Sequence, residues 1–201
     1  MTWPVPGGWL ERLGSEPTTI EDRSRGIARR LAAGRWQGIE AELAAAVVYA
    51  GGDPALLESI SIQGLVQGGP ARVLADVGMV GAGLRGAFAG AVAAEAPGAA
   101  GLARRAGTTR SAAGMRLYWD EFARGGLVVV GNAPTALLAA LDLAPAAPPA
   151  FVIATCPGFT LAQAAKDALV ESGLPHLAVL GTRGGSGLAA AAANVLLRQP
   201  G

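Results

Sequence analysis

Short apolar runs alternate with longer amphipathic or alanine-rich segments along most of this chain, and glycine-bearing turns separate the two kinds of segment. The clearest run, LVVV at 127–130, is continuous and mostly β-branched, which is typical of a strand buried on both faces of a parallel sheet. Three further short runs, at 71–75, 151–154 and 177–180, are also predicted to be strands. The repeated order of strand, turn and helix predicts an α/β fold, with a doubly wound, mostly parallel sheet flanked by helices.

Helices are predicted before the first of these strands and after the turns. Thr18 or Thr19 is expected to cap a helix that ends near residue 33, and a second helix is expected at 38–50. Pro134 suits the first turn of another helix, because the N–H that it lacks has no partner there in any case. The remaining expectations are a short helix and turn at 56–62 and helices at 110–123, 134–143, 161–172 and 188–197.

The 201 residues are predicted to form one domain at 17–201, preceded by an irregular Pro- and Gly-rich arm at 1–16. Hydrophobic residues make up 51% of the chain and charged residues 15%, which excludes a disordered protein. The net charge is +1 and no Lys/Arg run exceeds two residues, so no nucleic-acid partner is expected. The apolar segment at 188–197 is too short to cross a membrane and the first residues lack a secretory signal pattern, so a cytoplasmic protein without a membrane partner is expected.

Reactive side chains are scarce. Cys156 is the single cysteine and His176 the single histidine, which excludes an internal disulfide and a multi-ligand Cys/His metal site. His176 precedes a predicted strand, at the sheet edge opposite the usual ligand edge, and is expected to be a solvated loop residue. Cys156 follows a strand but no base is identifiable for it, so a structural thiol is expected rather than a nucleophile.

Three glycine-bearing turns follow predicted strands and lead into helices, at 131–135, 156–160 and 181–186. Ligands of open parallel sheets bind beyond the carboxyl ends of the strands, where N–H groups at helix N-termini point outward. Glycine lets the backbone approach a ligand, while Asn, Thr and Ser side chains add hydrogen bonds. The same residues also serve ordinary turns and caps, so both interpretations stay open at this point.

Two arginines and one glycine pattern are further candidates for ligand binding. Arg110 starts a predicted helix, where a cation opposes the helix dipole, so the sequence predicts a partner anion there or, in the plain alternative, a solvated side chain. Arg183 follows the same reasoning. Residues 81–86 match G-x-G-x-x-G, but no acidic residue lies about twenty positions later, so a nucleotide-binding protein is the weakest hypothesis.

Four short motifs follow one another in the second half of the chain: GTTRSAAG at 107–114, GNAPTAL at 131–137, KDAL at 166–169 and GTRGGSG at 181–187. In this order and spacing they resemble the precorrin-8X methylmutase (precorrin isomerase) family of vitamin B12 (cobalamin) biosynthesis. The first half is similar more loosely, through DRS at 22–24 and VLADVGMV at 73–80.

The resemblance implies an α/β isomerase of about this size, usually a homodimer with active sites at the subunit interface, that uses no metal or organic cofactor. Members move a methyl group from C-11 to C-12 of a tetrapyrrole (corrinoid) macrocycle, giving hydrogenobyrinic acid or its cobalt counterpart. The flat ring needs an apolar cleft, and its carboxylate arms need cations, helix N-termini and hydroxyl groups. The residues expected to bind the arms are Thr108, Arg110, Ser111, Asn132, Thr135, Arg183 and Ser186.

Departures from the family leave two hypotheses open. Tyr49 stands where the family has its catalytic histidine, and a phenol is a much weaker acid than an imidazolium, although it still donates a hydrogen bond. Ala164 replaces a glutamate, Thr182 replaces a second arginine, and the stretch after Gly86 is shorter than in the family, which usually has another strand there. The chain is therefore either a methylmutase with Tyr49 as its donor or a paralogue that binds corrinoids without turnover.

Overall fold

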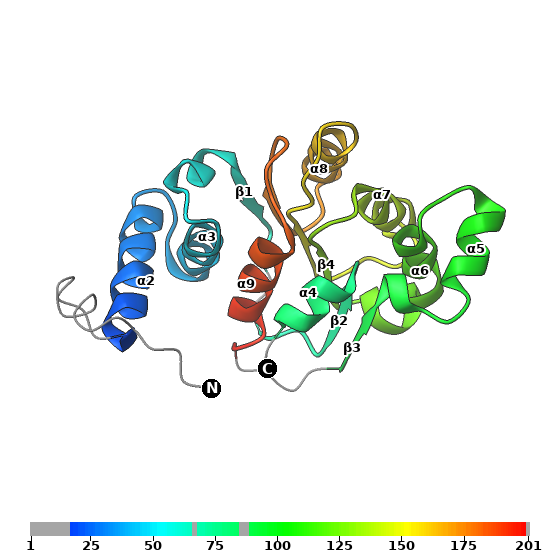
Figure 1. Ribbon diagram of the computed structural model, residues 1–201, viewed down its shortest axis with the longest axis horizontal. Helices are drawn as coiled ribbons and strands as arrows, with labels where there is room; N and C mark the ends of the chain where they lie inside the picture. The colour runs from blue at the N-terminus through cyan, green and yellow to red at the C-terminus, as the bar shows by residue number, and fades with distance from the viewer. Residues whose placement is uncertain (1–16, 66–67, 85–88, 200–201) are drawn as a thin grey trace, which may run out of the picture.

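A six-stranded sheet forms the centre of the molecule, and helices cover both of its faces (Figure 1). This computed structural model describes residues 17–65, 68–84 and 89–199, so the predicted arm at 1–16 lies outside the described residues. The strand order is β1-β6-β5-β4-β2-β3, and every neighbouring pair is parallel except β1 and β6. The strands are β1 (Ile60–Gln63), β2 (Arg72–Ala75), β3 (Ala89–Val92), β4 (Leu127–Val130), β5 (Phe151–Ala154) and β6 (His176–Val179).

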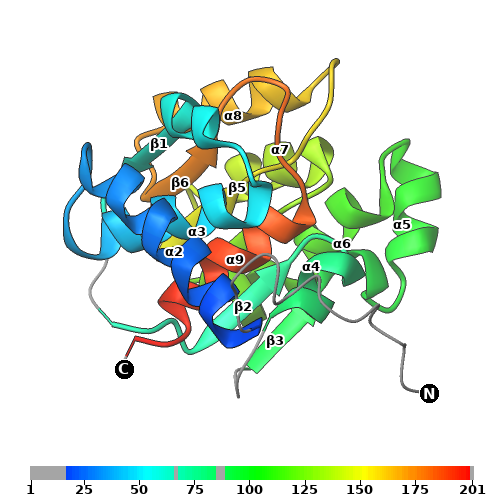
Figure 2. The ribbon, with the colours of Figure 1, turned by 60° about the vertical axis from the view of Figure 1, so that its left-hand side comes forward.

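Helices divide into two layers, one on each face of the sheet. Figure 2 shows α2 and α3 beside α9 on one face, and the core contacts place α6, α7 and α8 on the other. The α-helices are α2 (Pro17–Ala33), α3 (Gly38–Gly51), α4 (Gly78–Gly83), α5 (Ala99–Ala106), α6 (Arg110–Tyr118), α7 (Pro134–Leu143), α8 (Ala162–Glu171) and α9 (Ser186–Leu196). Shorter helical turns are η1 (Pro54–Ser59), η2 (Ala93–Glu95) and the π-helical η3 (Trp119–Ala123).

Alternation along the strands explains why the central runs are apolar throughout. In β4, Leu127 and Val129 join the core beneath α3 and α9, while Val128 and Val130 join the core beneath α6, α7 and α8. Burial of such a side chain contributes about 1.5–3 kcal/mol relative to exposure. A strand with one such core on each face therefore needs apolar residues at every position, as predicted for 127–130.

The sheet has a topological switch point between β2 and β4. From β2 the chain crosses to β3 on one side, and it then returns to β4 on the other side of β2. Ligands of open α/β sheets bind in the crevice at such a point, outside the carboxyl ends of the strands. The fold therefore directs attention to the segments that follow β2 and β4.

Most predicted elements are present, and the exceptions are instructive. The segment expected as a short helix and turn at 56–62 contains η1 and the edge strand β1, and β3 and α5 were not predicted. The stretch after Gly86, which the resemblance marked as shortened, still leads into a strand, β3, that lies parallel to β2. The first helix begins at Pro17, so Thr18 and Thr19 lie within it and do not precede it as caps. None of the described helices is long and apolar enough to span a membrane.

Candidate functional site

A buried carboxylate at the end of β2 organises the switch point. Asp76 is fully buried, and its Oδ2 accepts hydrogen bonds from the backbone N–H groups of Asn132 and Ala133 at 2.8 and 2.7 Å. Its Oδ1 accepts from the N–H of Gly131 at 3.1 Å. The backbone N–H groups of the turn at 131–133 therefore all donate hydrogen bonds within the protein. Of the two interpretations of this turn, these contacts favour the ordinary turn, because Asp76 accepts its backbone N–H groups.

Burial dominates the electrostatics of Asp76. Removal from water raises the pKa of this carboxyl, and the hydrogen bonds from Ala133, Gly131, Asn132 and Val77 lower it by less, so the pKa lies above its ordinary value. The sequence did contain a signal for this role: an aspartate follows directly after a buried strand, at the edge where turns and helix N-termini collect.

The turn at 181–186 is bonded to the neighbouring turn in the same internal way. Gly185 N–H donates to the Thr155 carbonyl and the Thr155 hydroxyl donates to the Gly185 carbonyl, at 2.6 and 2.9 Å. The Nζ of the fully buried Lys166 donates to the Arg183 carbonyl at 3.1 Å. Burial lowers the pKa of Lys166 and raises the pKa of the neighbouring Cys156 thiol to about 11, so Cys156 is a buried thiol, as predicted, whose thiolate form is disfavoured.

Several predicted ligand-binding residues do meet at this edge of the sheet. The Thr135 and Thr109 hydroxyls are 2.7 Å apart, which joins the N-termini of α7 and α6. Thr108, Arg110 and Asn132 are exposed beside this contact, whereas Ser111 lies behind the surface with 7% of its area exposed.

Ser186 adjoins the same turn from α9. A Cβ at Gly131 would come within 2.8 Å of the Ser186 Cα, so the N-terminus of α9 packs closely against the end of β4. The Ser186 hydroxyl is buried and has no hydrogen-bond partner among the described residues. A hydroxyl of this kind is suited to a ligand group that reaches the start of α9.

Arg183 points away from this group. Its Nη1 pairs with Asp53 Oδ2 at 2.6 Å, and its Nη2 donates to the Ala55 carbonyl and the Ser59 hydroxyl. The guanidinium therefore ties the turn at 181–186 to η1. The anion that the sequence predicted for Arg183 is a carboxylate of the protein itself.

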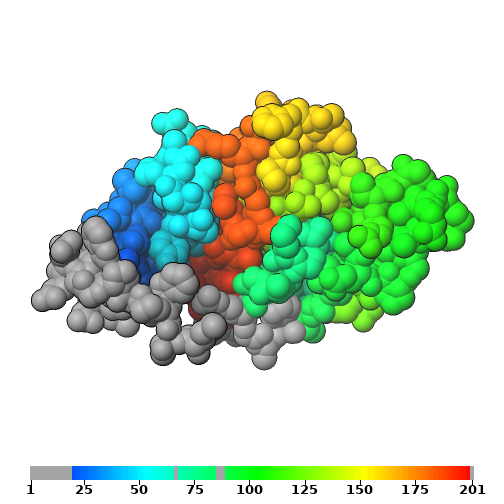
Figure 3. Space-filling model, viewed as in Figure 1, coloured from blue at the N-terminus to red at the C-terminus, as the bar shows by residue number. Residues whose placement is uncertain are grey.

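Tyr49 lies near the end of α3, where two hollows meet. One is a cavity of about 250 Å³ between α3, α4 and α9, whose lining includes Arg25, Tyr49, Gly187 and Arg198. In the space-filling view α9 lies at the surface between α3 and α4 (Figure 3). The other is an apolar groove of about 270 Å³ on the side of α2, lined by Ser24, Ile27, Ala28, Leu31, Val48, Tyr49, Gly52 and Pro54. Because Gly187 lies at the start of α9, the cavity reaches from Tyr49 to the first turn of that helix.

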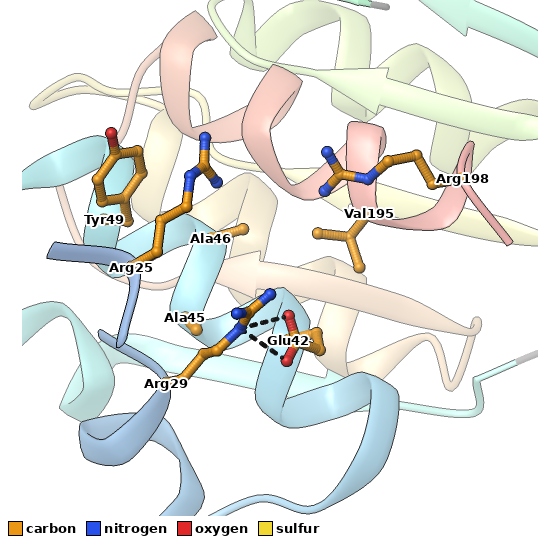
Figure 4. Close-up of a pocket in the computed structure, with 8 residues that line it drawn as sticks. All are labelled: Arg25, Arg29, Glu42, Ala45, Ala46, Tyr49, Val195 and Arg198. Carbon is orange, nitrogen blue, oxygen red and sulfur yellow. Dashed lines mark hydrogen bonds and ion pairs between the residues drawn. The ribbon is translucent and has the colours of Figure 1, made fainter. Parts of the chain in front are cut away.

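Sequence reasoning missed the arginines around Tyr49. The Arg25 guanidinium lies over the Tyr49 ring, 4.5 Å from its centre. Arg198, after α9, reaches the same cavity, and Arg29 pairs with Glu42 at 3.0 Å beside it (Figure 4). The available signal was local: Arg25 and Arg29 are four residues apart and so share one face of a helix. The contribution of Arg198 depends on the tertiary fold.

One other expectation is wrong, and the weakest hypothesis, nucleotide binding, gains no support from the fold. His176 is fully buried at the start of β6, where its ring nitrogens contact the Ser61 hydroxyl at 3.0 Å and the Leu174 carbonyl at 2.7 Å, so it is not a solvated loop residue. Gly81 and Gly83 lie inside the short helix α4 and do not form a loop before a helix, which is where a dinucleotide-binding pattern needs its glycines. Among the described residues no cluster of His, Cys, Asp or Glu is suited to a metal ion.

Comparisons with known proteins agree on one family. The family model described as precorrin-8X methylmutase matches residues 19–199. The precorrin-8X methylmutase of Pseudomonas aeruginosa is 43% identical over 99 residues, which are 47% of each chain. That of a Sinorhizobium species is 46% identical over 101 residues, which are 48% of each chain. The chain spans about half the length of the curated relatives it matches.

Solved structures extend the similarity to nearly the whole chain. The crystal structure of precorrin-8x methyl mutase from Thermus thermophilus has a TM-score of 0.77 and 28% identity, and the match covers 90% of this chain and 95% of that one. A structure described as a precorrin-8X methylmutase related protein has a TM-score of 0.76 and 27% identity, over 87% of this chain and 98% of that one.

Proposed function

The chain belongs to the precorrin-8X methylmutase family, and we propose that it is itself an isomerase of cobalamin biosynthesis acting on precorrin-8X or its cobalt analogue. In the proposed reaction the bond between the methyl group and C-11 breaks, the bond to C-12 forms, and the ring double bonds rearrange. The product is hydrogenobyrinic acid or its cobalt counterpart. Atoms balance within the macrocycle, so the protein contributes positioning and a hydrogen bond.

The observation that carries this proposal is the position of Tyr49 between two unlike hollows. The groove with Ile27, Leu31 and Val48 is apolar, as a flat macrocycle requires, and the cavity with Arg25 and Arg198 is cationic, as its carboxylate arms require. A ligand that spans both would hold its ring edge against the Tyr49 phenol.

The residues at the carboxyl edge have a supporting role in this proposal. Arg110, Asn132 and Thr108 are exposed there and Thr135 is half-buried beside them, so they present a cation, an amide and two hydroxyls to carboxylate arms. Ser186, whose hydroxyl has no hydrogen-bond partner among the described residues, directly precedes Gly187, which lines the Tyr49 cavity. Arg110→Ala is expected to weaken binding of hydrogenobyrinic acid about ten- to a hundredfold, measured by titration of the corrin absorbance.

A second function, corrinoid binding without turnover, is favoured by one specific contact. Arg25 covers the Tyr49 ring, and a phenol gives up its proton far less readily than an imidazolium. If the phenol serves only as a contact surface, the same two hollows would hold a corrinoid intermediate or product for another protein. This alternative shares every binding prediction with the first and differs only in turnover.

We further propose that the protein is a cytoplasmic homodimer whose described residues form one methylmutase-like domain within 17–201. Exposed apolar side chains support a partner surface: Ile20, Ile27 and Leu31 line one face of α2, and Met79 and Phe159 stand out at the carboxyl edge of the sheet. Light scattering at micromolar concentration is expected to give the mass of two chains, and the mass of one chain would contradict the dimer.

Substitution of Tyr49 separates the two functions. Tyr49→His restores a stronger general acid at the same position, and general acid catalysis contributes about a hundred- to ten-thousandfold, so formation of the orange product from precorrin-8X should accelerate within that range. Tyr49→Phe removes the hydroxyl and should abolish the activity of the parent protein.

Titration of hydrogenobyrinic acid into the same three proteins is the control for binding. Product formation by the parent at the rate of Tyr49→Phe would exclude Tyr49 as the donor. Tight binding without turnover in all three proteins would establish the binding function and contradict the isomerase.

A further inference from the structure

Two cations, Arg25 and Arg198, line both the Tyr49 cavity of about 250 Å³ and a smaller hollow beside it, of about 30 Å³, which Figure 4 shows in close-up. Arg25 projects from α2 and Arg198 from the residue pair that follows α9, and their guanidinium groups point toward one another (Figure 4). These two residues are far apart in the sequence, so the fold brings the two charges together. Like charges held in this way repel unless an anion lies between them.

The acidic side chains nearby do not supply that anion. Glu42 pairs with Arg29 at 3.0 Å, and Glu21 receives hydrogen bonds from Nε and Nη2 of Arg25 at 3.0 and 2.7 Å, which leaves Nη1 outside that pair. Arg198 has no ion pair among the residues that the structure describes. Among the described residues, three arginines thus meet two glutamates, and one positive charge is left without a paired carboxylate.

The cavity has room for a ligand beside these cations. Its volume is about 250 Å³. Apart from Arg25, Tyr49, Asn194 and Arg198, the lining consists of small residues: Ala46, Ala50, Gly83, Gly187, Ala190 and Ala191. A carboxylate between the guanidinium groups would place the rest of its molecule over this alanine and glycine floor, next to the Tyr49 ring.

We infer that Arg25 and Arg198 form a clamp for one carboxylate arm of a flat polycarboxylate ligand whose ring lies against Tyr49. The inference rests on the proposed function for the identity of the ligand. It assigns to Arg25 and Arg198 the binding role that the sequence analysis gave to Arg183, whose guanidinium is held by Asp53. Arg25 would then have two contacts, one with the carboxylate of the ligand and one with the Tyr49 ring.

The test is a titration of hydrogenobyrinic acid, followed by corrin absorbance, into the parent and three charge-removing variants. Arg25→Gln and Arg198→Gln should each weaken binding about ten- to a hundredfold, because each loses a charge-assisted hydrogen bond to the carboxylate. Arg29→Gln is the matched control: it removes the same charge one turn further along α2 but from a residue paired with Glu42, and should change affinity less than about threefold. Equal losses in all three variants would show a general charge effect and overturn the clamp.

A double variant and a masked ligand sharpen the result. If both arginines hold the same carboxylate, Arg25→Gln with Arg198→Gln should lose less affinity than the product of the two single losses. The methyl ester of hydrogenobyrinic acid, with all its carboxylates masked, should bind the parent and the variants equally. Unchanged affinity for the free acid in Arg198→Gln, with thermal unfolding as in the parent, would also overturn the inference.

Failure of the proposed function has a separate signature. If the parent binds the free acid but forms no product from precorrin-8X, the isomerase proposal fails and the clamp stands. If the parent does not bind the free acid, calorimetric titration with benzenehexacarboxylate, a small flat polycarboxylate, tests the clamp by itself. Binding that is lost in Arg198→Gln supports the clamp, and absence of binding to the parent contradicts it.

Discussion

The carboxyl edge of the sheet and the cavity around Tyr49 adjoin at the start of α9, yet they are built in opposite ways. At the edge, the turns at 131–133 and 183–185 direct their backbone donors and acceptors inward, to Asp76, Thr155 and Lys166. At the cavity, two guanidinium groups and a phenol face open space of about 250 Å³. The edge satisfies its own polar groups, while the cavity leaves charge for something else to satisfy.

This difference indicates that the turns at the edge position the helices, whereas the cavity is the part available for contact with a ligand. The motifs that resemble the family most closely, GNAPTAL and GTRGGSG, fall largely in the internally bonded turns. The departure at Tyr49 falls in the cavity wall. A turn whose donors are used inside the protein fixes the start of a helix, and ligand contact is then left to the side chains that project from that helix.

Gly184 is expected to be the most sensitive position in the internally bonded edge. Its φ is +151°, and a Cβ there would overlap the Thr155 carbonyl, so Gly184→Ala must displace the backbone contact between two turns. Strain and overpacking together should lower the free energy of unfolding by about 3–5 kcal/mol. The midpoint of thermal unfolding should fall by about 6–20 °C.

Gly187 provides the matched control on the cavity side. A Cβ at Gly187 meets no atom within 4 Å, and the residue lies inside α9. Gly187→Ala should therefore be neutral or stabilise the fold by up to about 1 kcal/mol through helix propensity. Equal losses of stability in the two variants would contradict the contrast between a closed edge and an open cavity.

Asp76→Asn should produce the next largest effect. An amide offers one acceptor oxygen where the carboxylate offers two, so at least one of the backbone donors of Gly131, Asn132 and Ala133 loses its partner in a buried site. Chemical denaturation should show a loss of about 2–4 kcal/mol. Asp142→Asn, which breaks an exposed ion pair to Arg116, should cost less than about 1 kcal/mol and serves as the comparison.

The pH dependence of that difference has a definite sign. Because the pKa of Asp76 is raised in the folded protein, its contribution to stability is fully present below the unfolded value of about 3.9 and is lost as pH rises through the folded pKa. The excess stability of the parent over Asp76→Asn should therefore be greater near pH 5 than near pH 8. An excess that grows with pH would mean that the backbone hydrogen bonds outweigh burial.

The pair between Arg183 and Asp53 should show the smallest effect. Both side chains are nearly half exposed, so a double-mutant cycle with Arg183→Ala and Asp53→Ala should give a coupling of about 0.2–1 kcal/mol in the free energy of unfolding. Affinity for hydrogenobyrinic acid should stay within about threefold of the parent in Arg183→Ala, in contrast to Arg198→Gln. A tenfold loss in Arg183→Ala would return this residue to the ligand site.

How far the sequence predicted the fold depended on how strongly each segment was patterned. The run at 127–130 was unmistakable because both of its faces are buried. β3, with the sequence AGAV, was missed because alanine and glycine have little preference for strands. The edge strand β1 was also not predicted. Because Ser61 on β1 is the hydrogen-bond partner of His176, the histidine was wrongly expected in solvent.

The candidate site was predictable where its residues are contiguous and unpredictable where they are distant. Thr135 and Asn132 were found because they follow a strand directly. Arg198 and Arg25 meet only through the packing of α2, α3 and α9, and Arg183 meets Asp53 across 130 positions. No local pattern encodes such pairings, since each depends on how several helices settle on one sheet.

The chain has a single lysine, a single cysteine and a single histidine, and their common location has a practical consequence. Lys166, Cys156 and His176 are all fully buried, and all lie within the unit formed by β5, α8 and β6 or its turns. Reagents that acylate side-chain amines, alkylate thiols or modify imidazoles will therefore find their targets only when this unit opens. Labelling followed by mass spectrometry would then measure the opening rate of this βαβ unit at three different side chains, without any substitution in the chain.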